Sequence, residues 1–400
     1  MAQIPIREYD AKKMYLDSVR ETYSGIQIQK LEDIEKLEEQ KRYVIKPDML
    51  FGKRGKRGLL GVNLDKSGCK NWLEKHFQKR VDVDGVIGSL DIFLVEEFSE
   101  IQDEYYVSFS QSREGDLVHF SDTGGIDIEE NWESVTTLTI PVLQELNFEQ
   151  AQNLTKNNGE LSELILSLWK YYKSYGFVSL EFNPIARDTD GNFIILDAVA
   201  KVDDTEYYLQ KNNWKNLEFP NSFGFTENAG EGYIRELDTQ TGASLKLKIL
   251  NPEARIWTLF AGGGGSLVLT DTLGHLGFAS DIGNYGECSG NPSREFTREY
   301  TKTLLEQMLA SSHFGKYLII GGAIANFTYI DTTFAGVIDA LEIYAEKLRE
   351  DQVQILVRRG GINEKQGLEL LQNACQRLEI PAIITGSDAY MTDILKEIIL

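Results

Sequence analysis

Three glycine-marked segments in the C-terminal part of the chain have the composition of anion-binding corners. They are Gly262–Gly265, Gly321–Thr328 and Arg358–Gly361, and each follows a run of apolar, β-forming residues. Where the carboxyl end of a strand meets the start of a helix, backbone N–H groups are unpaired and the helix dipole favours negative charge. The pattern predicts that three such corners and two arginines form a pocket for a multiply charged anion, such as a phosphate or a polycarboxylate.

The side chains near these corners suggest how the anion is held. Arg358 and Arg359 are adjacent at a strand end, so they should point in different directions. One can bind a substrate carboxylate through its planar fork, while the other serves structure or an interface. His275 follows the Gly262–Gly265 segment by about three helical turns, so we expect it at the far end of that helix in a structural role.

The N-terminal half contains a basic, glycine-rich segment, Phe51–Gly58, which has four cationic side chains. Glycines let the backbone approach a ligand, and the cations could neutralise a polyphosphate. The segment lacks the Walker pattern, so it is not a P-loop. A solvated basic turn is the alternative interpretation. Lys46, which follows an apolar strand, could join the cations or could be an edge lysine with its charge in water.

Oxygen ligands and a strand end complete the candidate chemistry of this half. Glu181, Asn183 and Asp197 lie on the two arms of a predicted hairpin, where they could hold Mg²⁺ jointly with nucleotide phosphates. A polar edge of a half-exposed hairpin is the alternative. Val95–Phe98 closes an apolar strand before the acidic turn Glu100–Glu104. It could present backbone groups to an adenine and a carboxylate to the ribose, or it could be an ordinary strand end.

The elements that position these residues change in character along the chain. Hairpins at Tyr105–Phe120 and Val178–Leu196 flank a helical face at Leu161–Tyr172, which indicates an α+β domain over residues 1–245. Regular strand–helix alternation then predicts an α/β domain with a Rossmann- or flavodoxin-like parallel sheet over residues 246–400. We expect the linker near Gly242–Pro252.

The overall composition limits the partners and the compartment. The formal net charge is −21, which disfavours nucleic acid or an anionic membrane as a partner. No run approaches the roughly 20 apolar residues of a membrane span, and no signal peptide is evident. Cys69, Cys288 and Cys375 cannot all pair and lack metal-ligand spacing, so we expect reduced thiols and a cytoplasmic protein.

Several longer motifs, taken in order, resemble one known family. They are Val44–Asp48, Lys53–Lys56, Gly124–Trp132, Glu181–Pro184, Asn251–Trp257, Asn284–Glu287, Ile324–Thr328 and Val357–Gly361. Together they resemble ATP-citrate lyase, in the portion that forms the smaller subunit where the enzyme is split in two. The resemblance runs from about Ile6 to near the C-terminus. The β subunits of succinyl-CoA synthetase and citryl-CoA synthetase are wider relatives.

The resemblance implies an ATP-grasp domain followed by a succinyl-CoA synthetase-like, citrate-binding domain. In the first domain it implies that ATP phosphates are held by Lys46, Lys53, Arg54 and Gly55. It implies adenine contacts from the backbone at Glu97, Phe98 and Ser99, a ribose contact from Glu104, and Mg²⁺ ligation by Asn183 and Asp197. In the second domain it implies a citrate pocket made by Ser289, Gly290, Asn326, Phe327, Thr328 and Arg359. The Gly262, Gly263, Gly264 and Gly265 segment would lie beside the transferred phosphoryl group.

The resemblance also implies a partner and an overall reaction. ATP phosphorylates a histidine on a larger subunit, phosphate passes to citrate, and coenzyme A, bound mainly by that subunit, displaces it. The citryl-CoA lyase domain of the partner then releases acetyl-CoA and oxaloacetate, so the enzyme is an ATP-dependent acyltransferase. No catalytic residue is expected in this chain, which is consistent with its four histidines lacking a nucleophile–base set.

Three alternatives remain open at the level of sequence. The chain could be the large subunit of citryl-CoA synthetase, a related succinate-activating subunit, or a non-catalytic subunit that senses nucleotide and citrate. The chain also departs from the family pattern at Glu97, His275, Cys288 and Ala323. The alanine excludes a citrate contact through a hydroxyl at that position, whereas Glu97 matters little because the adenine contacts are to the backbone.

Overall fold

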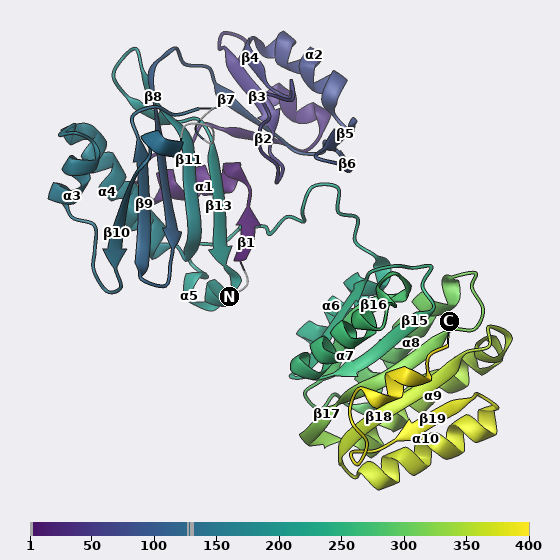
Figure 1. The fold of residues 1–400 in the computed structure, drawn as a ribbon. Helices are drawn as coiled ribbons and strands as arrows, with labels where there is room; N and C mark the ends of the chain where they lie inside the picture. The colour runs from purple at the N-terminus through teal and green to yellow at the C-terminus, as the bar shows by residue number, and fades with distance from the viewer. Residues whose placement is uncertain (1–2, 126–127, 129–131, 400) are drawn as a thin grey trace. The chain divides into compact units, whose positions relative to one another are not determined.

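The computed structural model of the chain describes residues 3–125, 128 and 132–399. It forms two compact units, Met1–Phe225 and Thr226–Leu400, which Figure 1 draws from purple to teal and from green to yellow. Part of the Gly124–Trp132 motif, namely positions 126, 127 and 129–131, lies outside the described residues. In the described part of the chain, no helix is long and apolar enough to cross a membrane.

A seven-stranded antiparallel sheet dominates the first unit, in the order β1-β13-β11-β8-β9-β10 with β12 paired to β11. The strands are β1 (Gln3–Ile6), β8 (Ile101–Gln111), β9 (Gly115–Ser121), β10 (Thr136–Pro141), β11 (Phe177–Asp188), β12 (Phe193–Ile195) and β13 (Ala198–Asp203). The helices of this part are α1 (Glu8–Ser18), α3 (Phe148–Leu154), α4 (Gly159–Ser174) and the short α5 (Tyr207–Gln210). Side chains of α1 and α4 bury one apolar cluster with the sheet, including Phe109, Trp169 and Leu180.

A smaller antiparallel sheet, in the order β2-β7-β3-β4, has its own apolar cluster in the same unit. Its strands are β2 (Ile26–Ile28), β3 (Tyr43–Pro47), β4 (Gly61–Leu64) and β7 (Phe93–Glu97), and the hairpin β5 (Arg80–Val83) and β6 (Val86–Ser89) is separate. The helix α2 (Lys66–His76) begins at an Asp65 cap and packs on β4. Both predicted hairpins are confirmed, because β8 pairs β9 and β11 pairs β12.

The second unit contains a four-stranded parallel sheet in the order β15-β17-β18-β19, as the strand–helix alternation predicts. The strands are β15 (Ile256–Ala261), β17 (Tyr317–Tyr329), β18 (Gln354–Ile362) and β19 (Ala382–Thr385), and the antiparallel pair is β14 (Ser244–Ile249) and β16 (Asn284–Ser289). The helices are α6 (Ala229–Thr239), α7 (Gly263–His275), α8 (Arg294–Ala310), α9 (Ile330–Glu350) and α10 (Glu364–Leu378).

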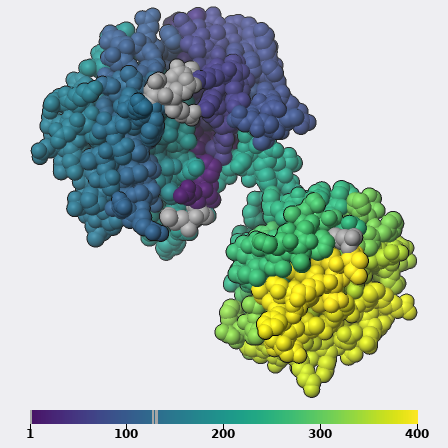
Figure 2. Space-filling view, viewed as in Figure 1, coloured from purple at the N-terminus to yellow at the C-terminus, as the bar shows by residue number. Residues whose placement is uncertain are grey.

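Both faces of the parallel sheet are buried, which explains its nearly continuous apolar strands. Trp257 and Leu259 of β15 pack in one cluster with α8, α9 and α10. Phe260 packs in a second cluster with Leu269 of α7 and with the C-terminal residues around Leu395. Those last residues, yellow in the space-filling view, cover one side of this unit (Figure 2).

The units divide between Phe225 and Thr226, whereas the sequence analysis placed the boundary after residue 245. The Gly242–Pro252 segment is not a linker, because it contains strand β14, which pairs with β16. Helix α6 also belongs to the second unit, since the Glu231 carboxylate accepts a hydrogen bond of 2.7 Å from the Ile249 N–H. Glycine and proline are typical of loops, and they lie at the two ends of the Gly242–Pro252 segment. The residues between them alternate between apolar and polar, which is the pattern of a strand.

Candidate functional site

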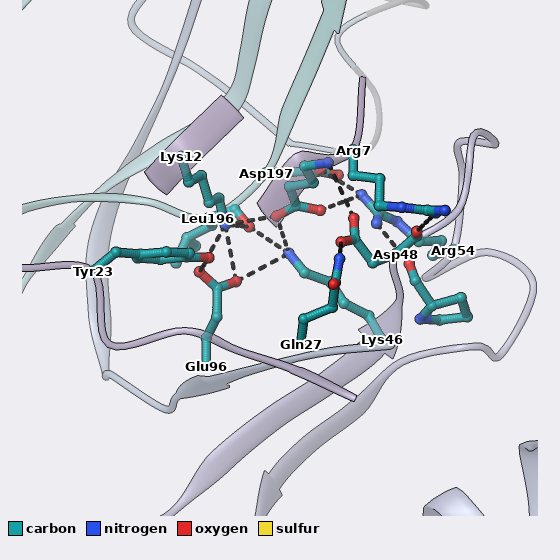
Figure 3. Close-up of polar contacts among 12 residues, drawn as sticks. Arg7, Lys12, Tyr23, Gln27, Lys46, Asp48, Arg54, Glu96, Leu196 and Asp197 are labelled. Atoms are coloured by element: carbon teal, nitrogen blue, oxygen red, sulfur yellow. Dashed lines mark hydrogen bonds and ion pairs between the residues drawn. The ribbon is translucent and has the colours of Figure 1, made fainter. Parts of the chain in front are cut away.

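Lys46, on strand β3 of the smaller sheet, lies in a buried network of charges in the first unit (Figure 3). Its Nζ is 2.6 Å from Glu8 Oε1 and 3.4 Å from Glu96 Oε2, and it donates a 2.6 Å hydrogen bond to the Leu196 carbonyl. Burial alone would lower the pKa of Lys46, but these carboxylates outweigh it and raise the pKa above its usual value. Lys46 is therefore a fixed, charged group and not an edge lysine in water.

Arg54, from the basic glycine-rich segment, joins the same network. Its guanidinium pairs with Asp197, lies 2.8 Å from Glu8 Oε2, and donates a 2.9 Å hydrogen bond to the Pro47 carbonyl. The segment is thus not simply a solvated basic turn, because the Arg54 side chain is only 8% exposed. Three predicted site residues meet here: Lys46 and Arg54, which are near each other in the sequence, and Asp197, which is far from both (Figure 3).

Lys53 and Gly55 lie in the exposed turn beside Arg54. Lys53 has a left-handed backbone, with φ of 60°. The Gly55 carbonyl accepts a 3.1 Å hydrogen bond from the Gly58 N–H, which closes the turn. The structure therefore places these two residues at the solvent-exposed rim of the charged network.

Two members of this network, Glu8 and Lys12, were missed by the sequence analysis. Lys12 Nζ lies 2.9 Å from both oxygens of Glu96 and 2.8 Å from the Leu196 carbonyl. Burial would raise the pKa of Glu8, but Lys12, Lys46 and Arg54 hold it well below its usual value. The sequence does contain one indication of this pair. Glu8 and Lys12 are four residues apart, so their opposite charges lie on the same side of a helix.

Asn183 and Asp197 lie where β11 runs beside the start of β13. The Asn183 N–H donates a 3.1 Å hydrogen bond to the Asp197 carbonyl, and Asn183 Oδ1 accepts one of 2.8 Å from the Gly125 N–H. Glu181 lies two residues away on β11, opposite Val199. Among the described residues, no group of three acidic, histidine or cysteine side chains could hold a metal alone. Asn183 and Asp197 supply one amide oxygen and one carboxylate group. These fit Mg²⁺ only when phosphate oxygens of a bound nucleotide complete the coordination shell of the ion.

The predicted adenine segment lies at the end of strand β7. The Glu97 side chain pairs with Lys41 at 2.6 Å, and the Phe98 N–H donates a 2.8 Å hydrogen bond to the Arg42 carbonyl. Ser99 follows in the connection to β8. Glu104 is half-buried on β8, where burial raises its pKa. Glu96, the neighbour of this segment, also binds Lys12, so the same strand contributes to both the predicted adenine segment and the charged network.

The second unit buries two adjacent arginines, Arg358 and Arg359, and Arg359 has no carboxylate partner among the described residues. Arg359 is 3% exposed, and its Nη1 donates a 2.8 Å hydrogen bond to the Ala323 carbonyl. Arg358 donates instead to the carbonyls of Gly322 and Ala389, so the two side chains have different roles, as predicted. Burial lowers the pKa of Arg359 to about 10, with a smaller contribution from the neighbouring Arg358 charge.

Two elements besides β18 lie close to this guanidinium, because Gly322 of β17 and Cys288 of β16 are its neighbours. Two glycines leave little space here. A Cβ atom added to Gly322 would lie 3.0 Å from Arg359 Nη1, and one added to Gly265 would lie 3.1 Å from the backbone N of Ala323. Ser289 and Gly290 follow the buried Cys288. Burial raises the pKa of the Cys288 thiol to about 12, although the nearby Arg359 charge acts in the opposite direction. Thr328 is buried, whereas Asn326 and Phe327 are exposed on the same strand. The start of α7, the end of β16 and strand β18 therefore meet at Arg359.

The glycine corners differ from the prediction in one respect. Only Gly262 precedes its helix, as a cap with φ of 85°, and Gly263–Gly265 form the first turn of α7. The glycines of Gly321–Thr328 and Arg358–Gly361 lie inside β17 and β18, and helices α9 and α10 begin only after these strands end, at Ile330 and Glu364. Their irregular register between Gly321 and Tyr329 explains the glycines better than a strand–helix corner does. His275 is the last residue of α7, as expected.

Domain families match both units of the chain. The family described as the ATP-citrate synthase ATP-grasp domain matches residues 2–214, and the one described as ATP citrate lyase citrate-binding matches residues 226–400. ATP-citrate synthase alpha chain protein 2 of Arabidopsis thaliana is 38% identical over 418 aligned residues, covering 100% of this chain and 98% of the relative. The chain belongs to the ATP-citrate lyase family. It contains the ATP-grasp and citrate-binding domains of that enzyme.

Other relatives and solved structures agree with this family. ATP-citrate synthase of Homo sapiens is 41% identical over 361 residues, covering 88% of this chain but 33% of the longer human protein. ATP citrate lyase from Methanothrix soehngenii, solved in complex with citrate and coenzyme A, is 41% identical with a TM-score of 0.84, covering 98% of both chains. The Methanosaeta concilii ATP citrate lyase solved with (3S)-citryl-CoA is 40% identical with a TM-score of 0.86, again over 98% of both chains.

Proposed function

We propose that this chain binds ATP in its first unit and citrate in its second, as the ATP- and citrate-binding subunit of an ATP-citrate lyase. The observation that carries the proposal is Arg359, a buried guanidinium that donates to the Ala323 carbonyl and has no carboxylate partner among the described residues. A buried charge is stable when an opposite charge compensates it, and a polycarboxylate supplies that charge. The solved relatives with citrate or citryl-CoA support this ligand over an inorganic anion.

The nucleotide contacts follow from the charged network of the first unit. The phosphates would be held by Lys46, Lys53, Arg54 and Gly55. Lys46 and Arg54 are buried and fixed by carboxylates, whereas Lys53 and Gly55 lie at the exposed rim of the charged network. The adenine would contact the backbone at Glu97–Ser99, and Glu104 would bind the ribose. Asn183 and Asp197 would hold Mg²⁺, which neutralises charge on the phosphates during phosphoryl transfer. The chain then contributes positioning and charge compensation.

In the second unit, the citrate contacts would come from elements around Arg359. The guanidinium would fork one carboxylate. Backbone and side-chain donors would hold the remaining polar groups, and they come from Ser289, Gly290, Asn326, Phe327 and Thr328. The first turn of α7, Gly262–Gly265, would face the phosphoryl group, because N–H groups at a helix start bind anions.

We further propose a separate, larger partner subunit. The Arabidopsis relative, named an alpha chain, is matched along 98% of its length, whereas only 33% of the human protein is matched. In our proposal the partner carries the phosphorylated histidine, binds most of coenzyme A and cleaves citryl-CoA to acetyl-CoA and oxaloacetate. We also propose a Rossmann- or flavodoxin-like class for the parallel-sheet unit. The three buried free cysteines support a reducing, cytoplasmic location.

The direct test is isothermal titration of the purified chain with citrate, with succinate titrated in parallel. We expect citrate to bind and succinate to give no heat, because succinate has one carboxylate fewer to compensate Arg359. Succinate binding without citrate binding would contradict the lyase assignment and favour a succinate-activating enzyme. A second assay distinguishes a lyase from a citryl-CoA synthetase. It measures the release of oxaloacetate by the chain reconstituted with its partner, since only a lyase releases this product.

A further inference from the structure

Glu8 contacts three buried cations at once. Its Oε1 lies 2.6 Å from both Lys12 Nζ and Lys46 Nζ, and its Oε2 lies 2.8 Å from Arg54 Nη2. These cations come from α1, from β3 and from the turn that follows β3. Lys46 and Arg54 are also the two buried residues among the proposed phosphate ligands. One carboxylate therefore bridges the two cations that would contact the nucleotide.

The Glu8 side chain is itself held in place. It is the first residue of α1 and is only 4% exposed. A carboxylate at this position is stabilised by the helix dipole. The Glu8 N–H donates a 3.0 Å hydrogen bond to Asp48 Oδ1, and Asp48 lies two residues beyond Lys46. The helix and the strand are thus connected through both the backbone and the side chain of Glu8.

We propose that Glu8 is a positioning residue that orients Lys46 and Arg54 toward the nucleotide phosphates. The inference rests on the proposed binding of ATP, since Glu8 is expected to act through Lys46 and Arg54 and through Asp197, with which its carboxyl group shares a hydrogen bond. Lysine and arginine side chains lose considerable conformational entropy when they are ordered. A fixed carboxylate orders both before the ligand arrives, which reduces the cost of binding.

The other carboxylates of the network make the loss of Glu8 harmful to phosphate binding. Without Glu8, the nearest carboxylate to Lys46 is Glu96, at 3.4 Å, on the strand of the predicted adenine segment. Arg54 would retain its pair with Asp197, the proposed metal ligand. Both cations would then shift toward these groups and away from the phosphates. Removing a negative charge would by itself favour an anionic ligand, so the sign of the change in affinity distinguishes positioning from simple repulsion.

The experiment compares the full chain with Glu8→Gln, using MgATP and adenosine as separate probes. Titration calorimetry measures MgATP, and ligand-observed NMR measures adenosine. We expect Glu8→Gln to raise the Kd for MgATP about tenfold and to leave adenosine binding unchanged, because adenosine has no phosphates. The matched control is Asp17→Asn, which removes a carboxylate paired with Lys13 at 2.7 Å on the same helix but in solvent. The control should change neither affinity.

Other outcomes contradict the inference in separable ways. Unchanged or tighter MgATP binding by Glu8→Gln would overturn the positioning role. An equal loss of adenosine binding would mean that Glu8 only maintains the fold of this unit. If Glu8→Gln does not fold, Glu8→Asp keeps the charge but is one methylene too short to bridge all three cations, and it must still weaken MgATP selectively. Failure of the unaltered chain to bind MgATP would instead refute the proposed ATP site, whereas citrate titration would still test the second unit.

Discussion

The two candidate sites bury their cations in different electrostatic settings. In the first unit, Lys46 and Arg54 are paired with carboxylates, so the network is close to neutral within itself. In the second unit, Arg358 and Arg359 donate to backbone carbonyls. The Glu364 carboxylate interacts with the Arg358 charge, whereas no carboxylate among the described residues compensates Arg359. Cations that already pair with carboxylates must give up part of those contacts to bind an anion. A guanidinium without a carboxylate partner gains one when the anion binds. We therefore expect nucleotide affinity to depend on several residues and citrate affinity to depend strongly on one.

The most severe effect expected is on phosphoryl transfer. Asp197→Asn removes the proposed carboxylate ligand of Mg²⁺ and should slow ATP-dependent phosphorylation of the partner by more than about a hundredfold, because the metal neutralises the transferred phosphate. Citrate affinity should not change. The measurement is incorporation of labelled phosphate into the reconstituted complex. Asp203→Asn, at the other end of β13, is the control, and normal phosphorylation by Asp197→Asn would remove that residue from the metal site.

A large loss of affinity is expected from the single uncompensated arginine. Arg359→Ala should weaken citrate binding by at least about thirtyfold, which is the lower range for removing one partner of a buried charge pair. MgATP affinity should stay the same, and calorimetry measures both. Arg359→Lys should recover only part of the loss, because a lysine lacks the planar fork.

Arg377→Ala is the matched control for the arginine prediction, since Arg377 forms an exposed pair with Glu342 on a neighbouring helix. It should leave both affinities unchanged. Equal losses of citrate and MgATP affinity in Arg359→Ala would indicate general misfolding. That result would contradict the contrast between a distributed and a single-residue site.

An effect on stability is also expected, and it tests the contrast between two carboxyl groups of helix α1, those of Glu8 and Asp10. Glu8 has a lowered pKa, whereas burial and the nearby Asp48 charge raise the pKa of Asp10 to about 7. A raised folded-state pKa means that stability falls as pH rises from about 4 to about 7, because the unfolded state ionises first. Asp10→Asn should therefore stabilise the first unit by roughly 1–3 kcal/mol at pH 8 and have little effect at pH 4.

This stability change is measured as the shift of the first-unit transition in calorimetric unfolding at the two pH values. The second-unit transition serves as the internal control, because Asp10 belongs to the first unit. A stabilisation that is equal at both pH values would contradict the titration of Asp10 as its cause.

Much of the fold was predictable from local patterns. The sequence predicts one helical face with Phe334, Val337 and Leu341, a helix from about Glu364 to Leu378 and a strand over Ala382–Thr385. The structure confirms them as α9, α10 and β19. These segments have strong periodicity and clear ends. The prediction failed where glycine marks an irregular strand, as in β17 and β18, and where β14 was taken for a linker. A glycine permits many backbone conformations, so its presence alone does not select one of them.

The sequence by itself determined which residue types were available for chemistry and, through the family motifs, which of them belong to the candidate sites. Only the tertiary structure decided that Glu8 bridges Lys46 and Arg54 and that Arg359 is buried with no carboxylate partner in the described part of the chain. Residues 8, 54 and 197 are far apart in the chain, and no local pattern encodes their contacts. The charge environment of a side chain depends on which distant groups exclude water from it, and that is a property of the folded molecule.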